Sequence, residues 1–206
     1  MNKSFTLIEL IVVIAIIAIL AAIIAPNAFR AIEKAKITKC ASDLRTIKSA
    51  TQAYYADVGK FPPVDDHYCL PCPDGSVFTD GPHQFAGIDF FENKADAVYG
   101  GYQGWDGPYL ERWPTVPWNP SGALYPNYQY QGPWADFDNN NVEDESIEIH
   151  FWATPVETAQ GRGLLIDRVL DDGNLSTGNF LSGDSFDPLS GNPKCSVCMF
   201  YNAGTH

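Results

Sequence analysis

Oxygen-bearing side chains recur at alternate positions of one acidic segment, residues 136–145. This rhythm is typical of calcium loops, in which carboxylates, amides and one main-chain carbonyl group supply the ligands. Counted from the start of the segment, position twelve is Ile147 rather than the usual bidentate Glu, so an EF-hand is not expected. The two interpretations are a calcium site of another kind and an acidic, solvated hairpin loop. The candidate ligands are Asp136, Asp138, Asn140, the carbonyl group of Val142, and Asp144.

A second acidic stretch, residues 171–179, has the sequence DDGNLSTGN. Asp171, Asp172 and Asn174 are a weaker candidate for binding a cation. The same residue types are common in turns, where their side chains bond to nearby backbone groups. A turn-rich loop is therefore the expected structure of this stretch.

Four of the five cysteines form two CxxC pairs that lie far apart in the sequence. Four thiolates could hold zinc in a tetrahedral site. In an oxidising compartment the same cysteines would form disulfides that tie the C-terminal tail to the loop after the first helix. Neither pair is followed directly by His, so covalent haem attachment is excluded. The fifth, Cys40, is expected to be a small packed side chain. The paired cysteines are Cys69, Cys72, Cys195 and Cys198.

The charge balance argues against one broad class of partner. Asp and Glu number 25 against 13 Lys and Arg, which gives a net charge of −12. Because no basic stripe is present, nonspecific binding to nucleic acid through bulk charge is not expected. The four histidines are scattered, and no nucleophile motif, metalloprotease motif or phosphate-binding loop is present. No constellation of residues supports an enzyme.

One long helix is predicted over residues 5–58. Its first part, residues 5–29, is an apolar run of membrane-spanning length with a single charge, Glu9. Its second part is amphipathic, and Gly59 followed by two prolines ends it. Pro26 lacks an amide hydrogen, so a kink or a locally unwound stretch is expected just before it. The buried face is predicted to comprise Phe29, Ile32, Ile37, Cys40, Leu44, Ile47, Thr51, Tyr54 and Val58.

The rest of the chain, residues 59–206, is predicted to form a globular head. Residues 60–104 are rich in Pro, Gly and Asp and are expected to be loop. Strands are predicted at residues 125–131 and 146–153, the second with the alternation typical of a half-buried strand. Residues 163–170 fit either a short helix or a strand. The predicted fold class is α+β, a long N-terminal helix packed on a small antiparallel β-sheet head with long loops.

Glu9 is the candidate assembly residue. A carboxylate one turn into an apolar helix costs on the order of 2.5–3.5 kcal/mol in hydrocarbon, so such a group usually has a partner. One interpretation is an unpaired Glu close enough to the helix end to reach the lipid headgroups. The other pairs Glu9 with the N-terminal amine of another subunit. That pairing requires a free amine at Phe5, and therefore cleavage between Ser4 and Phe5.

The N-terminal sequence resembles the class III signal of type IV pilins and type II secretion pseudopilins. The resemblance rests on the short leader at residues 1–4, on FTLIEL at Phe5–Leu10, and on Pro26 inside the apolar run. It implies that a prepilin peptidase cuts directly before FTLIEL and methylates the new N-terminal amine, and that Glu9 then neutralises the amine of a neighbouring subunit. One departure is Ser4, which stands where the family nearly always has Gly.

A second similarity is to the major pseudopilin of type II secretion. It rests on GPYL at Gly107–Leu110 and on the turn PWNP at residues 117–120, which lacks the Gly of the family pattern. Major pseudopilins bind calcium in a loop between late strands, so the resemblance implies calcium binding by the acidic segment, residues 136–145.

Two uses of a filament subunit stay open. GPYL favours a major pseudopilin in a short periplasmic pseudopilus that acts as a secretion piston. The larger head, the long loops and the additional cysteines favour a type IV pilus-like filament at the cell surface. The contrasting class is a membrane-anchored extracytoplasmic binding module.

The family resemblance also implies partners and a location. The partners are further copies of the chain in a helical filament, the prepilin peptidase and an inner-membrane assembly platform. The subunit would lie in the inner membrane before assembly and in an extracellular or periplasmic filament afterwards. An exported head matures where disulfides persist, which favours disulfides over zinc for the two CxxC pairs.

Overall fold

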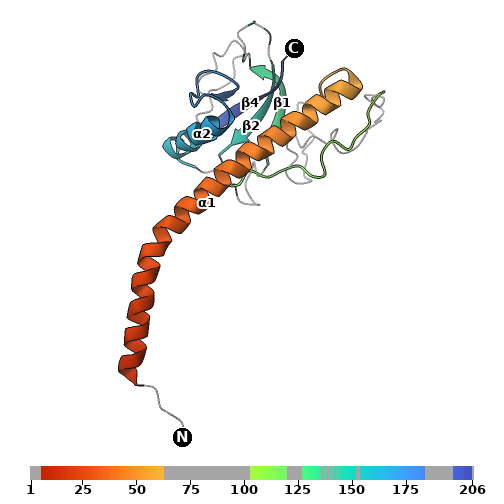
Figure 1. The fold of residues 1–206 in the computed structure, drawn as a ribbon. Coiled ribbons are helices and arrows are strands. Elements are labelled where there is room, and N and C mark those ends of the chain that lie inside the picture. Colours follow the sequence, from red (N-terminus) through yellow and green to blue (C-terminus); the bar gives the residue numbers. More distant parts are fainter. Residues whose placement is uncertain are drawn as a thin grey trace, which may run out of the picture. The chain divides into compact units, whose positions relative to one another are not determined.

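The computed structural model describes residues 6–62, 103–119, 127–135, 137, 140, 142, 144–151, 154–183 and 197–205. The chain divides into two compact units, residues 1–37 and residues 38–206. The predicted α+β fold class is confirmed. The elements are α1 (Leu7–Val58), β1 (Gln129–Ala135), β2 (Asp144–His150), α2 (Val156–Leu170), β3 (Phe180–Ser182) and β4 (Cys198–Gly204) (Figure 1).

Helix α1 contains 52 residues and ends at the predicted position, Val58. Gly59 follows with φ of 77°, and its N–H donates to the carbonyl oxygen of Tyr55 at 2.8 Å, which closes the last turn. The helix continues without a break through Pro26, so the locally unwound stretch expected there is not found. A proline removes one backbone hydrogen bond, and the cooperative bonding on either side can hold a long helix together across that loss.

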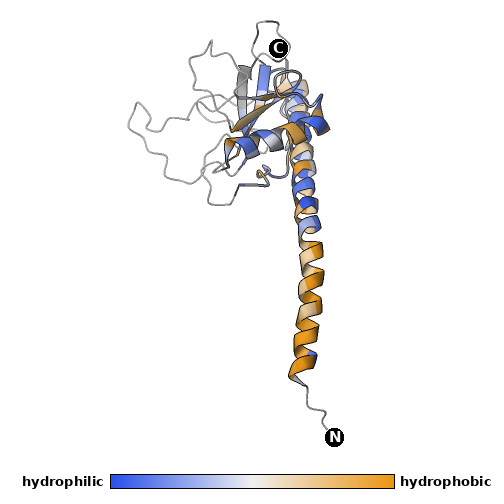
Figure 2. Cartoon of the chain, turned by 90° about the vertical axis from the view of Figure 1, so that its left-hand side faces the viewer, coloured by the Kyte–Doolittle hydropathy of each residue, from blue (hydrophilic) through white to orange (hydrophobic). Residues whose placement is uncertain are grey.

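Exposure divides α1 into two parts. Every side chain from Thr6 to Ile32 is exposed in the single subunit, and Figure 2 shows that the hydrophobic colour continues around the helix near its N-terminus. Farther along, the predicted buried face is found from Ile37 to Tyr54. Phe29 and Ile32 were predicted on that face but are 71% and 53% exposed. Helical periodicity identifies a face, but it does not show how far along the helix other parts of the chain cover it.

The sheet has four antiparallel strands in the order β1-β2-β4-β3. Ile147 of β2 lies opposite Tyr130 of β1 and opposite Tyr201 of β4, so these three side chains share one face. β1 begins four residues later than predicted at residue 125. Its pairing shifts register on both sides of Pro133, a residue that is tolerated on an edge strand. The segment that fitted either a helix or a strand belongs to α2.

The polar face predicted for β2 is also buried. Glu145 and Glu148 are only 2% and 8% exposed, and every residue from Asp144 to Ile149 is buried. Alternation correctly separates the two faces, but β2 is a central strand with neighbours on both sides, and both of its faces are covered. The prediction of a half-buried strand was therefore wrong.

Both helices pack against the same face of the sheet within residues 38–206. The Nζ atom of Lys48 in α1 lies 5.2 Å from the ring centre of Tyr201 in β4. A Cβ atom at Gly163 in α2 would come within 2.8 Å of the sulfur of Met199 in β4. Since Met199 and Tyr201 are two residues apart on one strand, they point to the same side. Figure 1 shows the C-terminal half of α1 crossing the strands, with α2 beside it.

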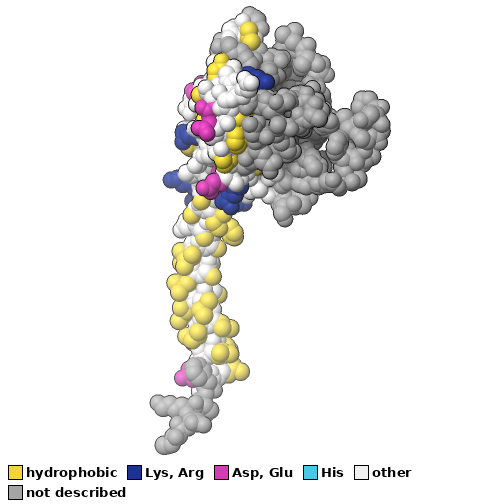
Figure 3. Space-filling model, turned by 90° about the vertical axis from the view of Figure 1, so that its right-hand side faces the viewer, with side chains coloured by type: hydrophobic (Ala, Val, Ile, Leu, Met, Phe, Trp, Pro, Cys, Tyr) yellow, Lys and Arg dark blue, Asp and Glu magenta, His cyan; other side chains and the backbone are white. Residues whose placement is uncertain are grey.

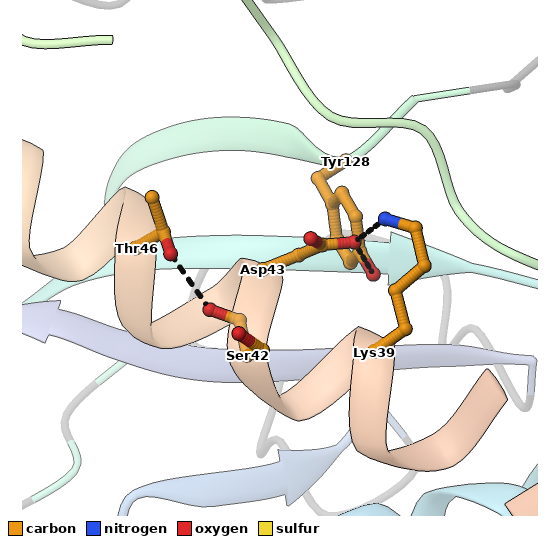
Figure 4. A network of polar contacts seen from close by, with 5 residues as sticks. All are labelled: Lys39, Ser42, Asp43, Thr46 and Tyr128. Atoms are coloured by element: carbon orange, nitrogen blue, oxygen red, sulfur yellow. Dashed lines mark hydrogen bonds and ion pairs between the residues drawn. The ribbon is translucent and has the colours of Figure 1, made fainter. Parts of the chain in front are cut away.

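A polar contact joins α1 to the segment before β1 (Figure 4). The Tyr128 hydroxyl donates to Oδ2 of Asp43 at 3.3 Å, and the Lys39 ammonium lies 2.5 Å from the same oxygen. One turn along, the Thr46 hydroxyl donates to the carbonyl oxygen of Ser42 at 2.9 Å, which keeps it within the helix. The Asp43 carboxylate therefore links α1 to the residue that directly precedes β1.

Candidate functional site

The first turn of α1 holds the carboxylate of Glu9 against its own chain. The Thr6 amide and the Thr6 hydroxyl both donate to Oε2 of Glu9, at 2.8 Å and 2.7 Å. In return, the Glu9 amide donates to the Thr6 hydroxyl oxygen at 3.4 Å. This reciprocal arrangement is a capping box, which satisfies amide groups that the first turn leaves without partners. Sequence reasoning missed Thr6, although the T-x-x-E spacing before an apolar run is the signal for it.

Capping does not neutralise Glu9. Thr6 is uncharged, so the carboxylate keeps its full negative charge, and it is the only charged side chain from Leu7 to Phe29. The positive end of the helix dipole stabilises an anion at this position, which makes the charge less costly there than farther along the helix. Ser4 and Phe5, the two residues of the predicted cleavage site, lie outside the described residues, so processing stays a prediction.

The apolar part of α1 presents an unusual surface. By length and composition it can cross a membrane, and none of its most apolar stretch is buried within the subunit. Figure 3 shows hydrophobic side chains along this stretch and Lys and Arg side chains gathered where it ends. The sequence places Arg30, Lys34, Lys36 and Lys39 there. Long basic side chains of this kind can reach from an apolar surface to lipid headgroups.

The GPYL segment belongs to the core of the head. Leu110 is buried with Ala50 and Tyr54 of α1 in one hydrophobic cluster. Just before the segment, Gly104 has φ of 93°, and a Cβ atom there would come within 2.2 Å of the Asp57 carbonyl oxygen. Only glycine fits so close to the helix backbone with this conformation. The segment therefore packs against the last turns of α1.

The acidic segment is described at three of its five candidate ligands. Asp144 is fully buried, and its Oδ2 accepts a hydrogen bond from the Phe137 amide at 2.9 Å. Asn140 is exposed, and its side-chain oxygen accepts from the Val142 amide at 2.7 Å. In the described residues, both side chains therefore bond to backbone groups of their own segment. Asp136 and Asp138 lie outside the described residues, so calcium binding here stays a prediction.

Cys198 takes part in a disulfide bond, and its partner is not among the described residues. Cys40 is a free thiol and is fully buried, as expected for a small packed side chain. Burial raises the pKa of the Cys40 thiol to about 12, although the hydrogen bond with Tyr128 acts in the opposite direction. Cys69, Cys72 and Cys195 lie outside the described residues, so the pairing of the cysteines stays a prediction.

Cys198 has two polar neighbours on the sheet. Its sulfur lies 3.4 Å from Nδ1 of His150, and Oε1 of Glu148 lies 3.6 Å from the same nitrogen. The three side chains are close enough together to hold a metal ion. A thiolate is the form of cysteine that binds metals, and a sulfur in a disulfide is not a thiolate. The group is therefore not a metal site while the disulfide is intact.

Comparison with known proteins agrees with this arrangement. Residues 1–25 match the family model of the prokaryotic N-terminal methylation motif. Residues 31–142, more than half of the chain, match the model described as PilW, C-terminal. The chain is also 32% identical over 125 residues to the type II secretion system core protein G of Aeromonas hydrophila, a match that covers 60% of this chain and 73% of the relative.

The chain belongs to the type IV pilin and pseudopilin family. It is a subunit of the pilus-like or pseudopilus kind, and this family of structural subunits points to a role other than catalysis. Membership implies assembly into filaments and processing by a prepilin peptidase. The apolar N-terminal helix with its prepilin-type signal fits anchoring in a membrane before assembly. No solved structure matches this pilin-family chain.

Proposed function

We propose that this chain is a structural subunit of a type IV pilus-like filament and that it assembles through α1. The observation that carries the proposal is the apolar part of α1, which is exposed on all sides and contains a single charge, Glu9. An apolar surface of this size is stable in water only when something covers it. The bilayer covers it before assembly, and the same segments of neighbouring subunits cover it in the filament.

Glu9 gives this nonspecific apolar association a defined register. In the bilayer its carboxylate sits at the helix end, held by Thr6. When subunits pack together, the N-terminal amine of a neighbour, at Phe5 after cleavage, supplies the missing positive charge. A buried charge that lacks its partner is strongly destabilising, so only the register that brings the amine to Glu9 is favoured. Processing at Ser4–Phe5 is required because it creates that amine.

A second candidate is the major subunit of a periplasmic pseudopilus. Two observations favour it: the similarity to a type II secretion core protein G, and the packing of GPYL against the end of α1. In both candidates the subunit leaves the inner membrane and requires an assembly platform there. They differ in the length and location of the filament.

The test is immunogold electron microscopy of intact and sheared cells with an antibody against the head, residues 59–206. A pilus-like subunit predicts labelled filaments that are released by shearing. A pseudopilus subunit predicts label that stays with the cells and appears on short filaments only after the outer membrane is opened. Label confined to the membrane, with only monomers after chemical crosslinking, would contradict both and favour a membrane-anchored binding module.

A further inference from the structure

The sheet brings a cysteine, a histidine and a glutamate together on one of its faces. His150 of β2 lies directly opposite Cys198 of β4, and Glu148 lies two residues before His150, on the same side of its strand. Met199 and Tyr201 of β4 point to the other face, against which both helices pack. The three side chains therefore lie on the face of the sheet that is turned away from α2 and from the packed half of α1.

The distances between their ligand atoms match those of a tetrahedral zinc site. Nδ1 of His150 lies 3.4 Å from Sγ of Cys198 and 3.6 Å from Oε1 of Glu148. Zinc bonds of about 2.0–2.2 Å to nitrogen and oxygen, and of about 2.3 Å to sulfur, place tetrahedral ligands roughly 3.4–3.6 Å apart. All three atoms lie within 4.8 Å of one another, so a small side-chain rotation is enough to bring the sulfur and the carboxylate oxygen to the same spacing.

Backbone hydrogen bonds hold the two strands that carry these side chains. The side-chain amide of Asn119 donates to the carbonyl oxygen of His150 at 2.6 Å. The Gly183 amide donates to the carbonyl oxygen of Cys198 at 2.9 Å. β4 is an interior strand, bonded to β2 on one side and to β3 on the other. Ligands on such a framework are already positioned, which lowers the entropy cost of binding an ion.

The surroundings of the group exclude water from most of it. Cys198 and Glu148 are buried, and Cys198 belongs to an apolar cluster with Phe137, Leu181 and Phe200. An apolar shell strengthens the attraction between a cation and a carboxylate, because little water remains to screen it. The His150 side chain is 20% exposed, so the group is not sealed inside the head.

The disulfide bond of Cys198 decides when the group can bind a metal ion. A dithiol reductant breaks the bond, which leaves Cys198 and its partner as thiols, while the reductant supplies two electrons and two protons and becomes a disulfide itself. Cys198 stays beside His150 after reduction, because β4 remains paired on both sides. The same thiol is present in a newly made chain before the disulfide forms.

We propose that Glu148, His150 and Cys198 form a zinc site in the reduced subunit, and that formation of the disulfide abolishes it. A thiolate with an imidazole suits zinc, whereas calcium and magnesium prefer ligand sets made of oxygen alone. Zinc displaces the proton of the Cys198 thiol and links β2 to β4. Three protein ligands leave its fourth position open.

This inference goes beyond the proposed function and does not depend on filament assembly. It also differs from a four-thiolate site built from the two CxxC pairs. That site would use neither His150 nor Glu148, so substitutions at these two residues distinguish the two kinds of zinc site.

The test uses the full-length chain in detergent with three substitutions, Cys69→Ser, Cys72→Ser and Cys195→Ser. Only Cys198 and the buried Cys40 remain, so Cys198 is a free thiol without added reductant. Zinc binding is measured by competition with a chromogenic chelator. One zinc per chain is expected, and adding His150→Ala should weaken binding by about a hundredfold or more. Glu157→Gln, on the exposed first turn of α2, is the matched control and should leave zinc binding unchanged.

The wild-type chain, reduced with a phosphine that carries no thiol of its own, gives a second measurement in case the triple variant fails to fold. It should bind zinc, and His150→Ala and Glu148→Gln should each weaken that binding, whereas the oxidised chain should bind none. The proposal is overturned if the folded triple variant binds no zinc or if zinc affinity survives His150→Ala. It is also overturned if the oxidised chain binds zinc as tightly as the reduced chain does.

Discussion

The hydroxyl group of Tyr109 donates a hydrogen bond to Oδ2 of Asp57 at 2.8 Å, and this bond joins the GPYL segment to the last turn of α1. The same hydroxyl accepts from the Asp106 amide at 3.1 Å. The ring of Tyr109 also packs edge-on against Tyr54, with ring centres 5.6 Å apart. The GPYL segment is therefore hydrogen-bonded to, and packed against, the last turns of α1, the helix that carries the assembly surface.

Removing this hydrogen bond should weaken the head without unfolding it. Tyr109→Phe keeps the ring contacts but loses the hydroxyl, and a bond to a carboxylate contributes on the order of 1.5–3 kcal/mol. Because this carboxylate is exposed, solvent screening lowers the expected loss of unfolding free energy below that range, to about 1 kcal/mol. Urea unfolding of the full-length chain in detergent measures it. Tyr55→Phe, in the same turn of α1 and half exposed, should change stability by less than about 0.5 kcal/mol. Equal losses in both variants would show that the Asp57 bond does not matter.

Processing should leave Phe5 as the first residue of the assembled subunit. Mass spectrometry of purified filaments is expected to find the N-methylated amine of Phe5 and no leader peptide. If subunits instead keep Met1, then Ser4 blocks cleavage, and Ser4→Gly should restore it. Unprocessed subunits in normal filaments would contradict the pairing of Glu9 with a new amine.

The cysteines should divide into one inert thiol and four bridged residues. Peptide mapping without reduction is expected to find disulfides among Cys69, Cys72, Cys195 and Cys198, each contributing a few kcal/mol where it closes a long loop. If four free thiols and one bound zinc per head are found instead, the prediction of disulfides is wrong and the cysteines form a metal site.

Cys40 should resist alkylation in the folded chain. With a thiol pKa of about 12, its thiolate fraction at pH 8.5 is roughly a thousandfold below that of an ordinary cysteine, and the thiolate is the reactive form. Iodoacetamide labelling followed by mass spectrometry should find Cys40 modified only after denaturation. The raised pKa also makes the free energy of unfolding depend on pH. Above about pH 9 the unfolded chain loses this proton first, so the Cys40 contribution to unfolding free energy should fall as pH rises.

The acidic segment should bind calcium. Calcium at a hundredfold excess over its Kd is expected to stabilise the fold by about 2.7 kcal/mol. Asp138→Ala should erase that shift and leave the melting temperature in chelator nearly unchanged, because the carboxylate stabilises the loop only with the ion bound. Magnesium should substitute poorly. An equal calcium effect with and without Asp138 would identify the segment as a solvated acidic turn.

Local signals in the sequence predicted much of the fold. The periodic pattern and Gly59 located the end of α1 at Val58, and alternation located β2 to within two residues at its start. β4 was missed because CMFYNAG does not alternate, and its pairing with β2 and β3 is a tertiary property. α2 was ambiguous because its apolar pattern is short and two glycines interrupt it.

The candidate sites were predictable only in part. Glu9 stands out because one charge in an apolar run is visible in any sequence. The burial of Asp167 was not predicted either, because nothing local shows that a residue in the last turn of α2 is fully buried next to Asp171 and Asp172. Burial of this kind depends on how α2 packs against the sheet, which the local pattern does not specify.

Filament yield from Glu9→Ala, compared with Thr6→Ala, tests the assembly mechanism most directly. Both variants disrupt the capping box, which costs about 1 kcal/mol of helix stability. Only Glu9→Ala also removes the charge that would pair with the amine of a neighbouring subunit. Breaking a buried pair costs about 3–5 kcal/mol, enough to lower yield at least about a hundredfold. Sheared or periplasmic filaments are counted by electron microscopy and normalised to membrane-inserted subunit. We predict that Thr6→Ala assembles, whereas Glu9→Ala inserts normally and forms almost no filaments. Wild-type yield from Glu9→Ala, or equal losses in both variants, would contradict assembly through an intersubunit charge pair.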